Sequence, residues 1–361
     1  MVFKKMNKRN LISNVVSIII LFLFCMMLDK SDSNTYSNLI SKVLIFSIAA
    51  LSLNIVCGCL GEFALGHGGF LLIGYTVACL AGEFMYSQFG DVYTDLVYHP
   101  RTGLKALGYL VMSSDVIIAA IITGIFGFIV GLIALGRLKG DYLAIVTLGV
   151  SLIFVNVAKN VPTLGGGSGI DIIDRVGGST LMYAIILVIA LFLIITFMKS
   201  RFGRGILAIR EDNIAAEASG IPVNKYKVMA FTFSAILAGL AGGLYAHFNA
   251  FKPIIFGQDL SIELLIIVVL GGLGSLTGSV IASFIIVFYN VWFCTQTWVP
   301  SFIKNNPKII YGIILVLIML FRSSGILGTA EFTWDWFYKK VKLLWNKLFK
   351  SKKKKDLEEV E

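Results

Sequence analysis

Charged residues are scarce in this chain. They make up only 14% of its 361 residues, whereas 57% are hydrophobic. Soluble domains contain about 25% charged and about 45–50% apolar residues. A chain with so little charge has too few polar side chains to cover a water-soluble globule of this size. The composition therefore predicts an integral membrane protein.

The residues that build metal and catalytic sites are equally sparse. The chain has three histidines and five cysteines, and the cysteines all lie in or beside apolar segments. Cys57 and Cys59 are two positions apart, which is not a zinc spacing, and no histidine cluster accompanies them. The phosphate-binding pattern G-x-x-x-x-G-K-[ST] does not occur in the sequence. We therefore predict no enzymatic activity, no metal site and no cofactor.

The formal net charge is +10, and the basic residues gather at the chain ends. Residues 1–10 are basic without an acid, and residues 330–361 are rich in lysine. In the second segment Phe337, Val341 and Leu344 recur at helical spacing, which predicts an amphipathic helix on the membrane surface. Basic ends favour the cytoplasmic side and contact with anionic membrane lipid. A nucleic-acid partner is not expected, because the apolar middle offers no basic face.

Long apolar runs fill the region between these ends, residues 11–329. A helix needs about 20 residues to cross about 30 Å of hydrocarbon. We predict an all-α, polytopic transmembrane helix bundle of about ten membrane segments, near residues 11–28, 40–60, 65–86, 113–135, 141–160, 180–198, 228–249, 262–271, 276–294 and 308–321. A signal peptide would be an alternative for the first segment, but its apolar core exceeds the usual length of about 7–15 residues, so we interpret it as a retained span.

The number of membrane segments in the stretch 261–290 determines on which side of the membrane the C-terminus lies. As one helix it would be about 45 Å long, more than a bilayer needs. The glycines of 271–274 interrupt it, and two segments leave both termini cytoplasmic, as the charge distribution favours. The short segment before the break crosses only part of the bilayer, so it must lie within the bundle or beside a wet cavity. It lies either near a transport path or at a close glycine-mediated helix contact.

One cytoplasmic loop, residues 204–222, contains a predicted short helix. Asp212 or Asn213 is a natural N-cap, and Gly220 followed by Pro222 ends the helix. About two helical turns are not stable in water alone, so this helix must pack against something. A separate protein and the chain's own spans are equally good candidates on physical grounds.

Five sequence blocks resemble the LivM-type permeases of branched-chain amino acid ABC importers, in the order found in that family. The blocks are Leu53–Gly58 with Leu65–Tyr75, Arg137–Gly149, Gly165–Ile170, Arg204–Pro222 with Tyr226–Phe231 and Ala238–His247, and Ser261–Ser275. One departure concerns the acid that many family members carry soon after the second block. This chain reads Val150-Ser151-Leu152 there.

The resemblance implies a multi-pass permease subunit of the cell membrane that carries leucine, isoleucine or valine. It also implies a second, LivH-like permease subunit, two ATP-binding subunits and an extracellular solute-binding protein as partners. Residues 11–329 would be the permease domain, and 204–222 would be its cytoplasmic coupling loop, the counterpart of the EAA loop. The expected ATPase-coupling residues are Arg210, Glu211, Asp212, Ala215, Ala216, Glu217 and Gly220.

Polar and glycine residues inside apolar spans are candidates for the translocation path. Intramembrane polar groups usually face a bundle interior or a wet cavity. The candidates are Asn54, Gly66, His67, Gly68, Gly271, Gly272 and Gly274. For each polar side chain, an interhelical hydrogen bond is an alternative explanation.

Two other functions remain open from the sequence. A permease for urea or short amides would look similar. An ion-coupled secondary transporter would need acids or bases inside the spans, and here Asp141, Lys159 and Glu263 lie near predicted span ends.

Overall fold

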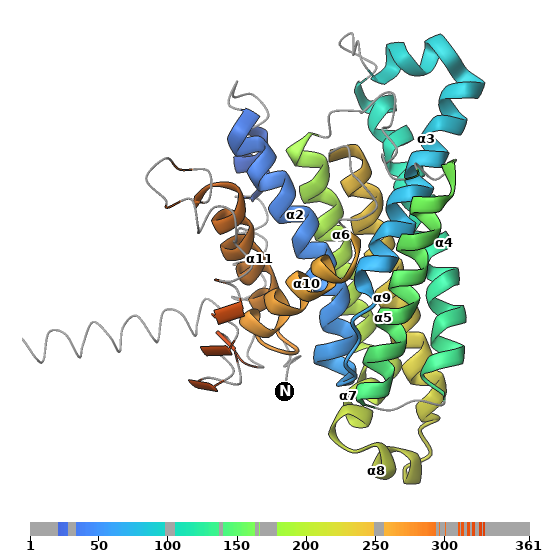
Figure 1. The fold of residues 1–361 in the computed structure, drawn as a ribbon, viewed down its shortest axis with the longest axis vertical. Helices are drawn as coiled ribbons and strands as arrows, with labels where there is room; N and C mark the ends of the chain where they lie inside the picture. The colour runs from blue at the N-terminus through green and yellow to red at the C-terminus, as the bar shows by residue number, and fades with distance from the viewer. Residues whose placement is uncertain are drawn as a thin grey trace, which may run out of the picture.

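The chain folds as a bundle of helices (Figure 1). The computed structural model describes residues 21–27, 34–97, 105–136, 140–162, 166, 179–248 and 256–293, and scattered single residues from 296 to 328. Within these residues the backbone is almost entirely helical and contains no strand. The predicted all-α class is therefore confirmed for this part of the chain.

Six helices in the described residues are long and apolar enough to cross a membrane. They are Thr35–Leu60, His67–Met85, Met112–Ala134, Tyr142–Asn160, Thr180–Lys199 and Val223–Phe248. Each coincides with one of the spans predicted between residues 40 and 249. The tails 1–10 and 330–361 lie outside the described residues, as do most of the predicted segment 11–28 and half of the predicted segment 308–321.

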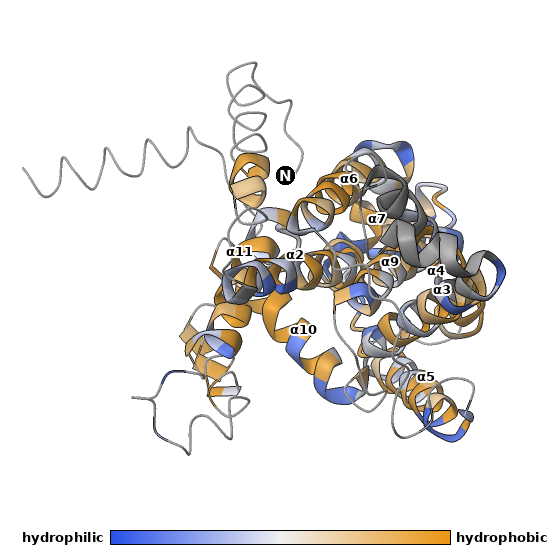
Figure 2. Cartoon of the chain, turned by 90° about the horizontal axis from the view of Figure 1, so that it is seen from above, coloured by the Kyte–Doolittle hydropathy of each residue, from blue (hydrophilic) through white to orange (hydrophobic). Residues whose placement is uncertain are grey.

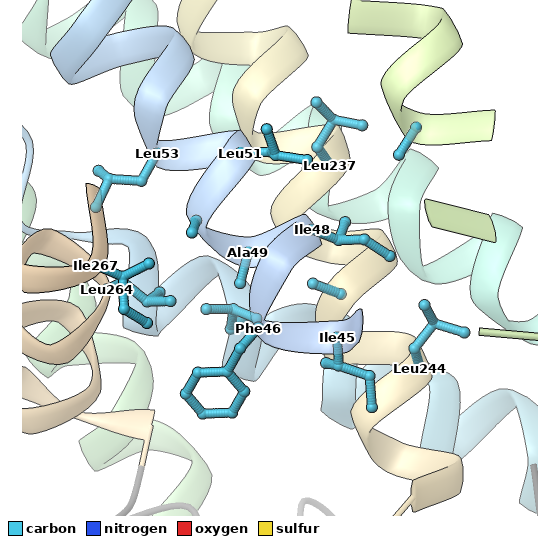
Figure 3. Close-up of a cluster of buried hydrophobic side chains, with 14 of the residues drawn as sticks. Ile45, Phe46, Ile48, Ala49, Leu51, Leu53, Leu237, Leu244, Leu264 and Ile267 are labelled. Atoms are coloured by element: carbon cyan, nitrogen blue, oxygen red, sulfur yellow. The ribbon is translucent and has the colours of Figure 1, made fainter. Parts of the chain in front are cut away.

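Two helices, α2 (Asn34–Asn54) and α9 (Val223–Phe248), lie at the centre of the bundle. The most apolar stretch of the α2 span is entirely buried, as expected for a helix that is apolar on all sides. Figure 3 shows the surrounding apolar layer, which includes Ile48, Leu51, Leu237, Leu244, Leu264 and Ile267. The end of α2 widens into a π-helix, η1 (Ile55–Leu60), which we did not predict from the sequence.

The helices α3 (His67–Val97), α4 (Lys105–Ala134) and α9 approach one another closely at small residues. A Cβ placed on Gly74 would lie 2.5 Å from the backbone oxygen of Gly239. Close backbone approach through glycine is a common way to associate helices in membranes. The helical backbones of α3 and α4 continue beyond the apolar spans, because helix formation does not require apolar residues.

Two further helices, α5 (Asp141–Asn160) and α6 (Thr180–Lys199), present large apolar side chains outward. Ile145 on α5 is 65% exposed and Phe192 on α6 is 67% exposed. The view from above shows hydrophobic residues on the outside of the bundle (Figure 2). Such faces fit lipid or a neighbouring membrane chain.

The stretch 261–290 forms two helices, α10 (Gln258–Gly271) and α11 (Leu276–Val291). The chain reverses between them, so that α11 runs back alongside α10 (Figure 1). A Cβ on Gly271 would lie 2.5 Å from the Gly278 backbone, which shows how closely the two helices meet. The predicted break at the glycines is confirmed.

The predicted loop 204–222 is wrong in one respect, because most of it is helical. A helix that we did not predict, α7 (Arg201–Glu211), precedes the expected short helix, α8 (Asn213–Ala218). We did not predict α7 from the sequence because the glycines at 203 and 205 lower helix propensity. These glycines lie on its buried face, where tertiary packing compensates.

Candidate functional site

The helices α7 and α8 form one end of the molecule (Figure 1). The side chain of Ser200 caps α7 by accepting a hydrogen bond from the Gly203 amide. The carboxylate of Asp212 caps α8 by accepting hydrogen bonds from the amides of Ile214 at 2.8 Å and Ala215 at 3.1 Å. Gly220 follows α8 with a φ of 81°, a conformation that favours glycine. The predicted capping and termination of α8 are therefore confirmed.

The helix α7 is fixed to the bundle by close contacts with α9. A Cβ on Gly205 would lie 2.4 Å from the ring of Tyr226, so a larger residue would separate the two helices. The rings of Phe202 and Tyr226 lie 5.6 Å apart. These contacts pack α7 directly against the first turn of α9.

The helix α8 has one face on the bundle and one face free. Ala216, one of the expected ATPase-coupling residues, is 4% exposed and packs against the chain's own helices, so its side chain does not face a partner. Ala215, Glu211 and Glu217 are exposed. Ile214 is 81% exposed and was not among the residues predicted for coupling. It is an apolar residue two positions after the Asp212 cap.

Arg210, one of the expected ATPase-coupling residues, lies with its side chain against the bundle. Its side chain lies against Gly61, where a Cβ would be 3.1 Å from the arginine Cγ. Its Nη1 lies 3.0 Å from the position of a Cβ on Gly274. Both glycines have a positive φ, 81° at Gly61 and 91° at Gly274. Arg210 thus connects α7 with the end of the α2 span and with the break between α10 and α11.

The side chain of Asn54, at the end of α2, forms hydrogen bonds with the turn between α10 and α11. Its Nδ2 donates to the Ser275 oxygen at 2.9 Å and to the Ser279 hydroxyl at 3.0 Å, and its Oδ1 accepts from the Gly274 amide at 2.8 Å. The side chain is fully buried. A Cβ on Gly58 would lie 1.9 Å from the Asn54 Oδ1, so only glycine fits there. The interhelical hydrogen bonds that the sequence left as an alternative are present.

A second group of candidate residues lies at the start of α3. His67 is 1% exposed, and its Nε2 lies 2.8 Å from the Ser234 hydroxyl of α9. The Gly68 amide donates to the Ser261 hydroxyl of α10 at 2.9 Å. A Cβ on Gly66 would lie 2.5 Å from the Thr147 oxygen of α5. This group holds α3, α5, α9 and α10 together.

The seven path candidates therefore form two clusters rather than one site. Asn54, Gly271, Gly272 and Gly274 lie at the tip of the α10–α11 hairpin, whereas Gly66, His67 and Gly68 lie near the start of α10. All seven are buried. The helix α10 joins the two clusters.

Two buried pairs of ionisable side chains connect segments that are distant in sequence. Lys227 on α9 forms an ion pair with Glu62, which follows η1. Asp115 on α4 lies 3.9 Å from the Nε2 of His247 on α9, and both side chains are fully buried. We did not predict a role for Asp115 from the sequence, although an acid beside a long apolar run is unusual.

No group of three or more histidine, cysteine, aspartate or glutamate residues that could hold a metal ion occurs in the described residues. Four buried cysteines of the described residues form no disulfide: Cys25, Cys57, Cys59 and Cys79.

Comparison with known proteins identifies related permeases. Residues 35–319 match the family described as branched-chain amino acid transport system / permease component. The high-affinity branched-chain amino acid permease LivM of Salmonella typhimurium is 30% identical over 323 residues, which is 80% of this chain and 68% of that protein. The probable LivM of Methanocaldococcus jannaschii is 25% identical, over 80% of this chain and 93% of that protein. The probable LivH of the same organism is 27% identical, over 61% and 75%. No solved structure matches the chain.

Proposed function

The chain belongs to the family of branched-chain amino acid transport system permease components, and we propose that it forms part of the path by which an ABC importer moves leucine, isoleucine or valine across the membrane. It is a multi-pass membrane protein and not an enzyme. Its relatives named LivM and LivH indicate a pair of permease subunits. Two ATP-binding subunits and an extracellular solute-binding protein would complete the transporter, with membrane lipid around it and no nucleic acid.

The proposed topology has about ten membrane segments and cytoplasmic termini. Six spans and the α10–α11 hairpin support it, because the hairpin returns the chain toward the side from which α10 starts. In this arrangement residues 1–10 are a basic cytoplasmic end, residues 11–329 are the permease domain, and residues 330–361 are an amphipathic cytoplasmic tail. The α7–α8 end then faces the cytoplasm.

The observation that carries the coupling proposal is the position of Arg210 between α7 and the breaks at Gly61 and Gly274. The exposed face of α8 would bind an ATP-binding subunit through Ile214, Ala215 and Glu217, with Glu211, Asp212 and Gly220 beside it and Ala216 anchoring α8 to the bundle. A nucleotide shifts a conformational equilibrium only if it favours one state. A movement of α8 would reach the α10–α11 hairpin through Arg210.

The relatives are named as permeases for branched-chain amino acids, which favours leucine, isoleucine or valine as the substrate over urea or short amides. Membership in a permease family of ABC importers disfavours an ion-coupled carrier. In proteoliposomes, uptake by the complete transporter should therefore require ATP and continue in the presence of a protonophore. Uptake that collapses with the protonophore would instead support ion coupling.

The replacement Glu217→Arg tests the coupling face. It places a positive charge on the exposed side of α8, where an ATP-binding subunit is expected to dock. Co-purification of the ATPase and uptake should both fall, whereas the exposed acid Glu83 of α3 should tolerate the same replacement. Normal ATPase attachment and normal uptake in Glu217→Arg would refute the proposed docking face.

A further inference from the structure

A short segment that follows the last predicted span contacts the turn between α10 and α11. The Ile326 amide donates a hydrogen bond to the Leu270 oxygen at 2.9 Å. Gly325, directly before it, is buried, and Ile326 packs against the main apolar core. The contact joins two parts of the chain that are far apart in the sequence, so it fixes the turn to the C-terminal end of the described residues.

The hydrogen bond from Ile326 satisfies a carbonyl group that α10 leaves open. The last four carbonyl groups of a helix accept no hydrogen bond within the helix. Because α10 ends at Gly271, the Leu270 oxygen is one of them. Backbone groups inside a membrane bundle need a partner from the protein where water is absent. The Ile326 amide supplies this partner, so a directed bond and not only apolar contact holds the segment 325–326 to the turn.

Gly325 lies so close to the same turn that no side chain fits between them. A Cβ on Gly325 would lie 2.6 Å from the Val269 oxygen and 2.7 Å from the Gly272 Cα. Gly325 also has a φ of 75°, a conformation that favours glycine. A larger residue at this position would push the segment 325–326 away from the end of α10.

The turn is therefore held in both of its halves. The first half, residues 270–272, contacts the segment 325–326. The second half, residues 274–275, is hydrogen-bonded to Asn54 and lies beside Arg210. A force on the second half changes the shape of the turn only when the first half stays in place. Without such a support the whole hairpin would shift together.

We infer that Gly325 and Ile326 are positioning residues for transport, which hold the first half of the turn while Arg210 displaces the second half. A movement of α7 would then reorient α10 relative to α11 instead of shifting both helices as one body. This inference rests on the proposed function, and it adds to the coupling path a part of the chain that lies after the last predicted span.

The ratio of leucine imported to ATP hydrolysed distinguishes this role from a purely structural one. A segment that only stabilised the fold would, when altered, reduce the amount of assembled transporter, and uptake and ATP hydrolysis would fall together. A lost support for the turn would instead leave ATP hydrolysis in place while uptake falls. The ratio does not depend on how much transporter assembles, so it can be measured even for variants of low yield.

The test uses the complete transporter in proteoliposomes, with its binding protein saturated by leucine. Ile326→Pro removes the amide that donates to Leu270, and Ile326→Val retains it. Ile326→Pro should lower the ratio of uptake to ATP hydrolysis at least about fivefold, the effect of losing one hydrogen bond, whereas Ile326→Val should stay within about twofold of wild type.

A second variant keeps the test decisive if Ile326→Pro does not assemble. Gly325→Ala places a methyl group against the Val269 oxygen and should lower the same ratio. Gly312→Ala is its matched control, because nothing lies within 4 Å of a Cβ at that position. In combination with Arg210→Ala, Gly325→Ala should lower the ratio little further, since both variants interrupt one movement.

A wild-type ratio in Ile326→Pro or in Gly325→Ala would overturn the inference, even if the yield of transporter fell. An equal loss in Ile326→Val, or fully additive losses in the combination with Arg210→Ala, would overturn it as well. The proposed function would still stand in these cases. It fails separately if the wild-type transporter imports none of leucine, isoleucine and valine.

Discussion

Glu62 and Lys227 form an ion pair inside the bundle, with side chains only 10% and 3% exposed. Glu62 belongs to the non-helical segment between η1 and α3, and Lys227 lies in the first turns of α9. The pair therefore fixes the segment between η1 and α3 to α9, and α9 in turn contacts α7. It lies near the contacts that Arg210 makes with Gly61.

Removing one member of this pair should destabilise the protein strongly. In Glu62→Gln the buried Lys227 ammonium loses its counter-charge, and such a loss costs about 3–5 kcal/mol. Thermal unfolding of the purified protein in mild detergent measures the effect. Lys225→Met, two residues away and exposed, is the matched control and should be nearly neutral. If Glu62→Gln unfolds at the wild-type temperature, the pair contributes nothing.

Asn54→Leu should loosen the α10–α11 hairpin. The replacement retains much of the volume but leaves the Gly274 amide without its acceptor, and a buried unsatisfied group costs about 1–3 kcal/mol. Asn156→Leu is a suitable control, because the Asn156 amide bonds within its own helix on an exposed surface. Thermal unfolding should distinguish the two variants. Equal stabilities would show that the Asn54 bonds are not important for the hairpin.

Gly274→Ala should both strain the backbone and press on Arg210. The φ of 91° is unfavourable for alanine by about 1–3 kcal/mol. The added methyl group would also lie 3.0 Å from the Arg210 Nη1. A double-mutant cycle with Arg210→Ala should therefore show a non-additive effect on uptake. Gly149→Ala is the control, since nothing lies within 4 Å of a Cβ at that position. Strict additivity would contradict a functional contact between Arg210 and Gly274.

The Asp115–His247 pair should behave differently from the Glu62–Lys227 pair. Neither Asp115 nor His247 has a hydrogen-bond partner for its buried side-chain atoms, so burial is poorly compensated. Replacing both with apolar residues, as in Asp115→Leu with His247→Leu, should give a protein at least as stable as either single variant. Melting temperatures of the two single variants and the double variant test this. A double variant less stable than both single variants would show that each side chain stabilises the fold independently of the other, and would contradict this prediction.

Sequence reasoning located the parts of this fold that depend on local properties. Apolar length located six spans, Asp212 marked the start of α8, and the glycines after Leu270 marked the hairpin. It missed α7, because glycine lowers helix propensity while the tertiary contact with Tyr226 requires glycine.

The partners of the buried polar side chains could also not be predicted from the sequence. Lys227 and Glu62 are 165 residues apart in the sequence, and Arg210 turns inward only because Gly61 and Gly274 leave room for it. Many of the residues that contribute to the candidate site could therefore be identified from the sequence, but Ile214 and Asp115 were missed, and the pairing of the side chains could not be predicted.

Ile214 gives the sharpest test of the α8 surface. A large apolar side chain that is 81% exposed at the α7–α8 end gains free energy only when a partner covers it. Ile214→Ser should leave the melting temperature of the isolated permease unchanged within error, because the side chain contacts little of its own chain. Attachment of the ATP-binding subunit should weaken at least about tenfold, the effect of losing one apolar anchor of about 1.5 kcal/mol or more.

Ala216→Ser is the matched control on the opposite face of α8, where the side chain is buried within the chain. It should lower the melting temperature but leave the attachment of the folded fraction intact, because its side chain does not reach the surface. The two variants thus separate the outward and inward faces of one short helix. If Ile214→Ser binds the ATP-binding subunit as tightly as wild type, the docking surface lies elsewhere. A movement of the ATP-binding subunit would then not be transmitted through α8 to the contact between Arg210 and Gly274.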